Sequence, residues 1–528
     1  MTNVNNALLT GLDQLNANGQ QHLLCGGLKG IEKESLRISK EGVISQTTHP
    51  KALGAALTHP YITTDYSEAL IELITPPFAD IKDSLNYLRN IHQFVYKNLD
   101  NEILLGASMP CGINGDLSIP IAEYGSSNIG RMKHVYRHGL WHRYGRTMQS
   151  IAGIHFNYSV PETLWPVLHK QKHSSLTLEQ FTDASYFGLI RNFQRMGWLI
   201  LYLFGASPAI CKNFFNSRPA LMAQFDEFDD GTLYHPYATS LRMSDIGYKS
   251  ENQANLRIDY NSIEGYVNSL SAAINTPYPE YEKIGIQVDG EYQQLNSNIL
   301  QIENEFYSTI RPKQINDPGE KPTLALKRRG VRYVEMRSLD LDIFNPIGID
   351  EHKARFIEAL LLTCLLQDSP QTSDKEHQIN NANQLAVSHL GRKPGLELTQ
   401  GNQKVLLRDW AGEILESMQA VCAVLDLDNT HKPYSSSLAK QGQLIENPDL
   451  TASAQMLEQM AQLKQPFARF ALNTSAEHAQ YFKDKPLDQS QEQQFMEMAA
   501  ESHVKQQEIE SDQQIPFEDY LKQYFLQV

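Results

Sequence analysis

The chain has 528 residues and a formal net charge of −15, with 41% hydrophobic and 20% charged residues. This composition is ordinary for a soluble globular protein, and the acidic balance argues against a general nucleic-acid binder, which needs a basic surface. A local basic site for an anionic substrate remains compatible with it.

The cysteines and the apolar segments indicate where the protein works. The cysteines are odd in number and lack CxxC spacing, so we expect neither a disulfide framework nor a structural zinc site, and a reducing compartment fits. No Lys or Arg precedes Lys29, so the basic region of a signal peptide is missing. The longest apolar stretch, residues 197–210, is shorter than the ~20 residues of a membrane helix. We therefore expect a cytoplasmic protein. The cysteines are Cys25, Cys111, Cys211, Cys364 and Cys422.

The first informative segment is residues 30–37, GIEKESLR. Read as a strand, it places Glu32 and Glu34 on the same face, because side chains alternate with period two. Two like charges side by side on a sheet repel each other. Either both carboxylates point into open water, or a cation lies between them.

Residues 68–78, EALIELITPPF, are predicted to form a second strand. Glu72 lies within an apolar run, and Asp65 precedes it. A lone carboxylate in such a run is costly to bury unless it has a partner. The next segment, residues 80–99, has apolar residues at helical spacing, which predicts an amphipathic helix with His92 packed in the core.

Residues 125–150 are unusually basic for an acidic chain. They contain five arginines or lysines and three histidines. For most of these side chains we expect a solvated helix face, and for one or two a contact with a substrate carboxylate or phosphate. Residues 237–248 and 301–313 add further cations. The basic residues are Arg131, Lys133, Arg137, Arg143, Arg146, Arg242, Arg311 and Lys313.

Two further strands are predicted at residues 150–160 and 331–341. In the first, His155 and Asn157 share a polar face, and in the second Glu335 and Arg337 share one. Each strand taken alone is equally compatible with a half-exposed sheet whose polar residues face water. Together, the acids and the imidazole suit two or three hard cations, Mg²⁺ or Mn²⁺, and not zinc. The candidate ligands are Glu32, Glu34, Asp65, Glu72, His155 and Glu335.

The later part of the chain is predicted to be helical. Residues 354–366 form a buried helix, and the polar residues 367–384 are the best candidate for a linker or long surface loop. Residues 385–528 show helical patterns and no concentrated chemistry, with residues 489–510 as a long solvated helix. We therefore divide the chain into a catalytic region, 1–370, and a mainly helical region, 371–528, packed on it.

Hard cations, arginines and an anionic substrate together suggest phosphoryl chemistry. The sequence contains neither GxxxxGK[ST] nor GxGxxG, so neither a P-loop nor a Rossmann site is supported. A nucleotide would therefore bind through metal and sheet.

Eight segments in order resemble the motifs of the glutamate–cysteine ligase family of the proteobacterial type, closely over residues 20–365 and more loosely beyond. The resemblance implies an α+β fold similar to glutamine synthetase, with a curved, mainly antiparallel sheet forming an active-site cup and helices outside. The segments are GIEKESLR, HPYITTDYSEALIELITP, YGSSNIGRMKHVYRHGL, MQSIAGIHFNYS, YLFGASPAIC, PYATSLRMSDIGY, QIENEFYSTIRPK and VEMRSLDLDIFNPIGID.

The resemblance also implies an activity. ATP, L-glutamate and L-cysteine would give γ-glutamylcysteine, ADP and phosphate through γ-glutamyl phosphate, the first step of glutathione synthesis. Mg²⁺, in two or three ions with Mn²⁺ as the alternative, would be held by the six candidate ligands, in a monomer without nucleic-acid or membrane partners.

The resemblance further assigns roles to single residues. Arg337 and Glu335 would be catalytic, with Arg337 facing the transferring phosphoryl group, and Arg242 would hold glutamate. The cysteine pocket, with Arg137 nearby, would consist of Tyr136, Gln149, Tyr248 and Tyr307.

Three alternatives stay open. A related carboxylate–amine ligase would keep the metal cup and take another amine. A metal-dependent phosphatase or hydrolase would consume ATP without an acceptor. A sensor would bind ATP and glutamate without turnover.

Overall fold

The computed structural model describes the chain except residues 1, 217, 248–252, 254–255, 513–514 and 528. One predicted site residue, Tyr248, therefore lies outside the described residues.

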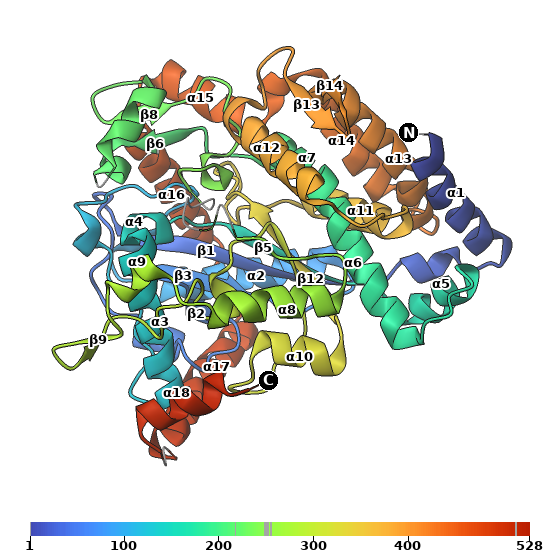
Figure 1. The fold of residues 1–528 in the computed structure, drawn as a ribbon. Coiled ribbons are helices and arrows are strands. Elements are labelled where there is room, and N and C mark those ends of the chain that lie inside the picture. Colours follow the sequence, from blue (N-terminus) through green and yellow to red (C-terminus); the bar gives the residue numbers. More distant parts are fainter. Residues whose placement is uncertain (1, 217, 248–252, 254–255, 513–514, 528) are drawn as a thin grey trace.

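An antiparallel sheet forms the centre of the molecule (Figure 1). Within the described residues it has seven strands in the order β11-β12-β5-β1-β3-β2, and β4 pairs with the end of β1. All four predicted strands are confirmed. The strands are β1 (Leu28–Ser39), β2 (Ile62–Thr64), β3 (Leu70–Ile74), β4 (Glu102–Leu104), β5 (Ile154–Ser159), β11 (Ile310–Lys313) and β12 (Tyr333–Leu339).

The register of the sheet brings the predicted polar residues together. Glu32 lies opposite His155 and Glu34 opposite Glu72, so β1 connects the two. Glu335 lies opposite Asn157 on the other side of β5. Because directly opposite residues point to the same face, these side chains share one face of the sheet.

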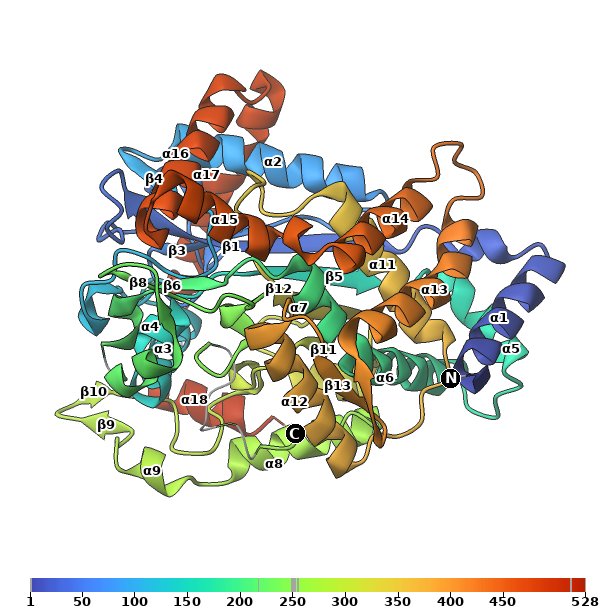
Figure 2. The same ribbon diagram turned by 90° about the horizontal axis from the view of Figure 1, so that it is seen from above.

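Helices cover the opposite face of the sheet (Figure 2). The predicted helix at 80–99 is confirmed as α2 (Ile81–Lys97), which begins where the Asp80 side chain accepts a hydrogen bond from the Lys82 amide. His92 on its apolar stripe is buried, as expected. The helices α11 (Glu351–Leu366) and α16 (Phe467–Asp484) pack against α2.

The remaining helices and small sheets surround this core, and the expected α+β architecture with helices outside the antiparallel sheet is confirmed. No helix among the described residues is long and apolar enough to cross a bilayer. The N-terminal and middle elements are α1 (Thr2–Ala17), α3 (Asn128–Tyr144), α4 (Arg146–Gln149), α5 (Trp165–Gln171), α6 (Leu178–Met196), α7 (Trp198–Phe204), β6 (Ala209–Cys211), β7 (Asp226–Glu227), β8 (Thr232–Tyr234), α8 (Ile263–Asn275), α9 (Pro279–Glu282), β9 (Gln287–Val288), β10 (Glu291–Tyr292) and α10 (Pro322–Arg329). The C-terminal elements are α12 (Asp374–Leu390), β13 (Glu397–Gln400), β14 (Gln403–Leu406), α13 (Leu407–Leu425), α14 (Pro433–Glu446), α15 (Ala452–Leu463), α17 (Gln489–Ser511) and α18 (Phe517–Phe525).

The prediction of a loop over residues 367–384 is wrong for most of that segment. Only its first residues connect α11 to α12, which begins after Ser373, whose side chain accepts a hydrogen bond from the Glu376 amide. Polar composition suggested a loop, but the buried Asn383 exchanges two hydrogen bonds with the backbone of Thr399 on β13. A buried amide with satisfied partners is compatible with a packed helix.

The helix predicted at 489–510 is confirmed as α17, but it is not solvated on all sides. Phe495 is buried and stacks on Phe94 of α2, with ring centroids 5.3 Å apart. The apolar contact fixes α17 against the outer side of α2.

Candidate active site

A cavity of about 590 Å³ lies over the polar face of the sheet. The strands β1, β3, β5 and β12 provide its floor, α3 and α4 provide one wall, and the segment after β11 provides another. The C-terminal helix α18 also reaches this cavity.

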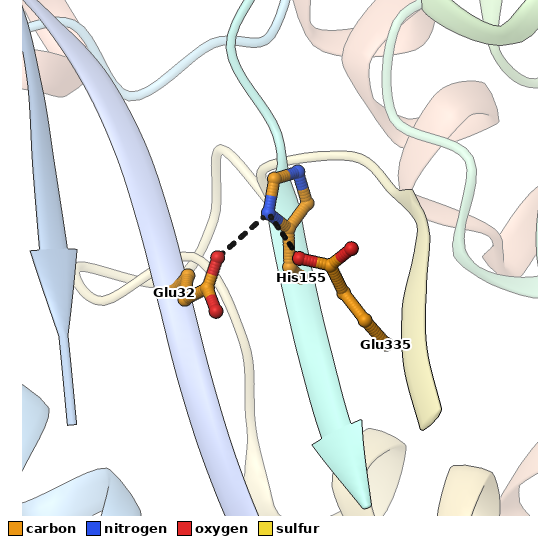
Figure 3. A group of neighbouring side chains, drawn as sticks. All are labelled: Glu32, His155 and Glu335. Atoms are coloured by element: carbon orange, nitrogen blue, oxygen red, sulfur yellow. Dashed lines mark hydrogen bonds and ion pairs between the residues drawn. The ribbon is translucent and has the colours of Figure 1, made fainter. Parts of the chain in front are cut away.

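Acidic side chains converge on one histidine at the floor of the cavity. Glu32, His155 and Glu335 come from three neighbouring strands and point toward one another (Figure 3). His155 Nδ1 lies 3.0 Å from a Glu32 oxygen and 3.9 Å from a Glu335 oxygen. A second group, Glu34 with Glu72, shares His155, whose Nε2 lies 3.5 Å from Glu34. In each group the candidate ligand atoms lie within 4.8 Å of one another.

The carboxyls of the cluster differ in their affinity for protons. Burial, together with the charges of Glu32 and other acids, raises the pKa of Glu72 well above its usual range. Burial likewise raises the pKa of Glu34. Burial also opposes ionisation of Glu335, but Lys313 and Arg337 outweigh it and hold the pKa of that carboxyl well below its usual range. The cluster therefore contains more carboxyls than its cations neutralise.

The donor set fits hard divalent cations. Carboxylate oxygens with a single imidazole are ligands that suit Mg²⁺ or Mn²⁺. The Nε2 atom of His155 is buried and has no hydrogen-bond partner among the described residues, as expected for a nitrogen that faces a cation. Asp65 lines the same cavity but is not part of either group of converging ligand atoms.

Cations border the cluster on the side of β11 and β12. Arg337 lies 3.2 Å from Glu335, and Lys313 lies 3.5 Å from the other oxygen of the same carboxylate. Glu335 raises the pKa of Lys313 although burial opposes it, so this amine is a firmly held positive charge. Positive charge beside carboxylates that could hold divalent cations is an arrangement that can stabilise a phosphoryl group.

Arg242 occupies a different place from the other predicted residues. It is fully buried and does not line the cavity. Its guanidinium donates a hydrogen bond to the Arg337 carbonyl at 3.0 Å and lies against Gly153, where a Cβ would come within 2.0 Å of it. The Gly153 amide in turn donates to Glu34 at 2.7 Å. Arg242 thus supports the floor of the cavity from below.

The predicted amine pocket lies on the α3 and α4 side. Tyr136, Gln149 and Tyr307 line the cavity, and the Gln149 amide donates a 2.5 Å hydrogen bond to the Tyr307 hydroxyl. Arg137 also lines it, and its Nε donates to the Asp65 carbonyl at 2.5 Å.

Sequence reasoning missed the cations on the opposite face of β1. Lys29 pairs with Glu358 at 3.0 Å, Lys33 Nζ lies 2.7 Å from His92 Nε2, and Arg37 pairs with Glu102 at 2.8 Å. All three cations are buried. Side chains alternate along the strand, so the pattern that places Glu32 and Glu34 on one face also places these three cations on the other. Their shared face could therefore have been predicted from the sequence.

Sequence reasoning also missed Tyr520 and Tyr524 of α18, which line the cavity. The sequence carries no local signal for them, because they lie far from the strands in the chain and reach the site only through helix packing.

Comparison with known proteins places the chain in a family. The family model for glutamate-cysteine ligase matches residues 12–387. Glutamate–cysteine ligase of Pseudomonas paraeruginosa is 49% identical over 502 residues, which are 95% of this chain and 94% of that protein. The corresponding protein of Alcanivorax borkumensis is 46% identical over 508 residues, covering 95% and 96%.

Solved structures agree with this assignment. The crystal structure of glutamate–cysteine ligase from Francisella tularensis in complex with AMP matches with a TM-score of 0.89 at 36% identity, covering 95% of this chain and 98% of that one. A bifunctional glutathione synthetase from Pasteurella multocida shares the fold, with a TM-score of 0.71 at 23% identity, over 90% of this chain and 55% of that one. This chain therefore belongs to the glutamate–cysteine ligase family.

Proposed function

We propose that the cavity is the active site of an ATP-dependent ligase that joins the γ-carboxylate of L-glutamate to the amine of L-cysteine, giving γ-glutamylcysteine, ADP and phosphate. This reaction is the first step of glutathione synthesis. The observation that carries the proposal is the convergence of two carboxylate groups on His155, directly beside Arg337 and Lys313, in a chain of this family.

The carboxylates and His155 are proposed to hold two or three Mg²⁺ ions, with Asp65 as a further ligand from the cavity wall. When bound, the ions offset the charge of the ATP phosphates and polarise the γ-phosphoryl group. Glu335 lies between the imidazole and the cations of β11 and β12, so it orients Arg337 as well as contributing a ligand oxygen.

The reaction needs two anions to approach each other. The γ-carboxylate of glutamate attacks the γ-phosphorus of ATP, the bond to ADP breaks, and γ-glutamyl phosphate forms. Arg337 and Lys313 reduce the repulsion and stabilise the charge that spreads over the phosphoryl oxygens. The amine of cysteine then attacks the acyl carbon, loses a proton, and phosphate leaves. The protein supplies no nucleophile in this sequence of steps.

The amine pocket positions the second substrate. Gln149 donates a hydrogen bond to the Tyr307 hydroxyl and so fixes its position, and Tyr136 lies on the same side of the cavity. Arg242 remains the residue proposed to hold glutamate, and from its buried position beneath Gly153 it also supports the backbone of the cavity floor. Tyr248 remains part of the proposed pocket.

We further propose that residues 1–370 form the catalytic region, on which residues 371–528 pack, and that the enzyme is a cytoplasmic monomer acting on small molecules.

The proposal is tested by measuring ADP release with ATP, Mg²⁺ and L-glutamate in the presence of L-cysteine, L-2-aminobutyrate, ammonia or no acceptor. We expect ADP release that depends on cysteine and yields a γ-glutamyl dipeptide. Turnover with only ammonia or another amine would retain the ligase and replace its acceptor. ADP release without any acceptor would indicate a hydrolase and overturn the amine pocket.

A further inference from the structure

The basic segment around residue 135 folds as helix α3 at the edge of the molecule (Figure 1), and three of its histidines have no part in the proposed reaction. His134, His138 and His142 recur at every fourth position, so they share one side of the helix. None of the three is among the described residues that line the active-site cavity, to which α3 contributes Met132 and Tyr136. The row of histidines therefore occupies a different face from the one turned toward the cavity.

The first two histidines of this row are placed for a shared ligand. The ring centroids of His134 and His138 lie 5.2 Å apart, and the ring planes are inclined by 53°. Two imidazole nitrogens bound at about 2.0–2.1 Å to one tetrahedral metal ion hold their rings roughly 5 Å apart. Arg131, one turn earlier, extends toward α18, with its guanidinium carbon 4.5 Å from the centroid of the Phe517 ring. The separation of the two rings thus matches that of two ligands on one ion.

His134 has the hydrogen-bond pattern of a metal ligand. Its Nδ1 atom lies 2.9 Å from the Ala122 carbonyl oxygen, which can only accept a hydrogen bond, so Nδ1 carries the proton and the lone pair is on Nε2. Metal-binding histidines commonly donate their other ring nitrogen to a backbone carbonyl or a carboxylate, which fixes the ring and raises its basicity. The exposed Glu123 carboxylate, 3.6 Å from the same Nδ1 atom, adds to this effect.

His138 offers the second nitrogen. Its Nδ1 atom is buried and has no hydrogen-bond partner among the described residues, so no protein group there imposes a tautomer on the ring. Burial, together with the neighbouring His134 and His142, lowers the pKa of His138 to about 4, so the ring is neutral at neutral pH. A neutral imidazole is the form that binds a metal ion.

The other end of the row is less suited to a cation. The His142 ring stacks on Trp141, with centroids 4.6 Å apart, and lies 6.1 Å from the centroid of His138. Its Nε2 atom lies 2.9 Å from the side-chain oxygen of Gln293. The guanidinium of Arg146 lies 3.9 Å from the Trp141 ring centroid and brings positive charge to this end. The geometry therefore favours the pair His134 and His138.

We propose that His134 and His138 form a binding site for one transition-metal ion of the Zn²⁺ class, separate from the proposed Mg²⁺ cluster. Imidazole nitrogens suit Zn²⁺, whereas Mg²⁺ prefers oxygen ligands, so the two sites select different ions. Two protein ligands leave the remaining positions of a tetrahedral ion to water. The ion would join successive turns of the helix whose other face carries the amine-pocket residue Tyr136.

Calorimetric titration with ZnCl₂ tests the site, with MgCl₂ in excess to occupy the carboxylate cluster. The wild-type chain should bind Zn²⁺, and His134→Gln and His138→Gln should each weaken this binding at least about tenfold, since even the loss of an outer partner of a metal ligand costs that much. His431→Gln is the matched control, because this histidine is exposed and lies outside α3. His142→Gln should also bind Zn²⁺ like the wild type.

The inference is overturned if the wild type binds no Zn²⁺, or if both pair variants bind it as tightly as the wild type. Binding that is lost only in Glu32→Gln would place the ion in the carboxylate cluster, and binding lost in His142→Gln but kept in His134→Gln would reject the chosen pair. Either pair variant decides the question if its circular dichroism spectrum is that of the wild type. No turnover is measured, so the result is independent of the proposed ligation.

Discussion

The two faces of strand β1 differ in how their charged side chains are paired. On the covered face each buried cation has a fixed partner: Lys29 has Glu358, Lys33 has His92 and Arg37 has Glu102. On the cavity face Glu32 and Glu34 share a single imidazole with two further carboxyls. Buried charges with permanent partners serve the fold, and a buried surplus of one sign requires a partner from outside the chain. The difference therefore separates the structural face from the face that binds ligands.

The largest effect is expected on the covered face. Lys29→Met leaves the Glu358 carboxylate buried without its cation, with the Tyr434 hydroxyl as a remaining donor. Breaking a buried pair from one side should lower the free energy of unfolding by about 3–5 kcal/mol, as measured by urea denaturation. The kcat of the folded enzyme should be unchanged.

Lys82→Met is the control for this prediction, because Lys82 forms an exposed pair with Glu351 at 3.8 Å and should contribute less than about 1 kcal/mol. The double variant Lys29→Met, Glu358→Leu should regain most of the lost stability. A single Lys29→Met variant as stable as the wild type would show that the covered face does not depend on this pair.

The cavity face should respond in activity and not in stability. Glu32→Gln removes one ligand oxygen charge while keeping the shape of the side chain, so turnover at limiting Mg²⁺ should fall about 100-fold. The melting temperature should not fall, because one of several repelling charges is removed. Steady-state rates across an Mg²⁺ titration and circular dichroism measure the two effects.

Glu123→Gln provides the matched control, since this carboxylate is exposed and lies 3.6 Å from His134. Normal activity of Glu32→Gln at limiting Mg²⁺ would remove Glu32 from the metal site.

The buried Lys33 on the covered face should also make the free energy of unfolding depend on pH. Burial lowers the pKa of Lys33 to about 7, whereas lysine in an unfolded chain titrates at about 10.4. Between these values the unfolded chain binds more protons, so wild-type stability should rise with pH, by up to about 1.4 kcal/mol per unit from this group. Lys33→Met should flatten the rise in unfolding free energies measured between pH 7 and pH 10. Equal slopes in both proteins would contradict the assignment.

The smallest effect is expected at the amine pocket. Tyr307→Phe removes the hydroxyl that accepts from Gln149, and with it the hydrogen bond that we propose this hydroxyl makes to cysteine. A bond of about 1 kcal/mol corresponds to an increase of about fivefold in the KM for cysteine. The KM for glutamate serves as the internal control, and an equal rise in both would count against the pocket.

The sequence by itself determined which residues share a face. Alternation along a strand is a local property, so Glu32 with Glu34, His155 with Asn157, and Glu335 with Arg337 could be placed without knowledge of the fold. The covered-face cations Lys29, Lys33 and Arg37 follow the same rule. The helix α2 was likewise predictable from its spacing.

Only the tertiary structure decided which strands are neighbours and what lies around them. The pairing of β1 with β5 joins residues more than a hundred positions apart, and no local pattern specifies it. No local pattern specifies the position of Arg242 beneath Gly153 or the position of the α18 tyrosines at the cavity. Nor does a local pattern specify the hydrogen bonds between Asn383 and Thr399, which accompany helix formation in a polar segment. Each depends on burial against a distant segment. Burial sets the cost of a charge or polar group, and it exists only once the chain has folded.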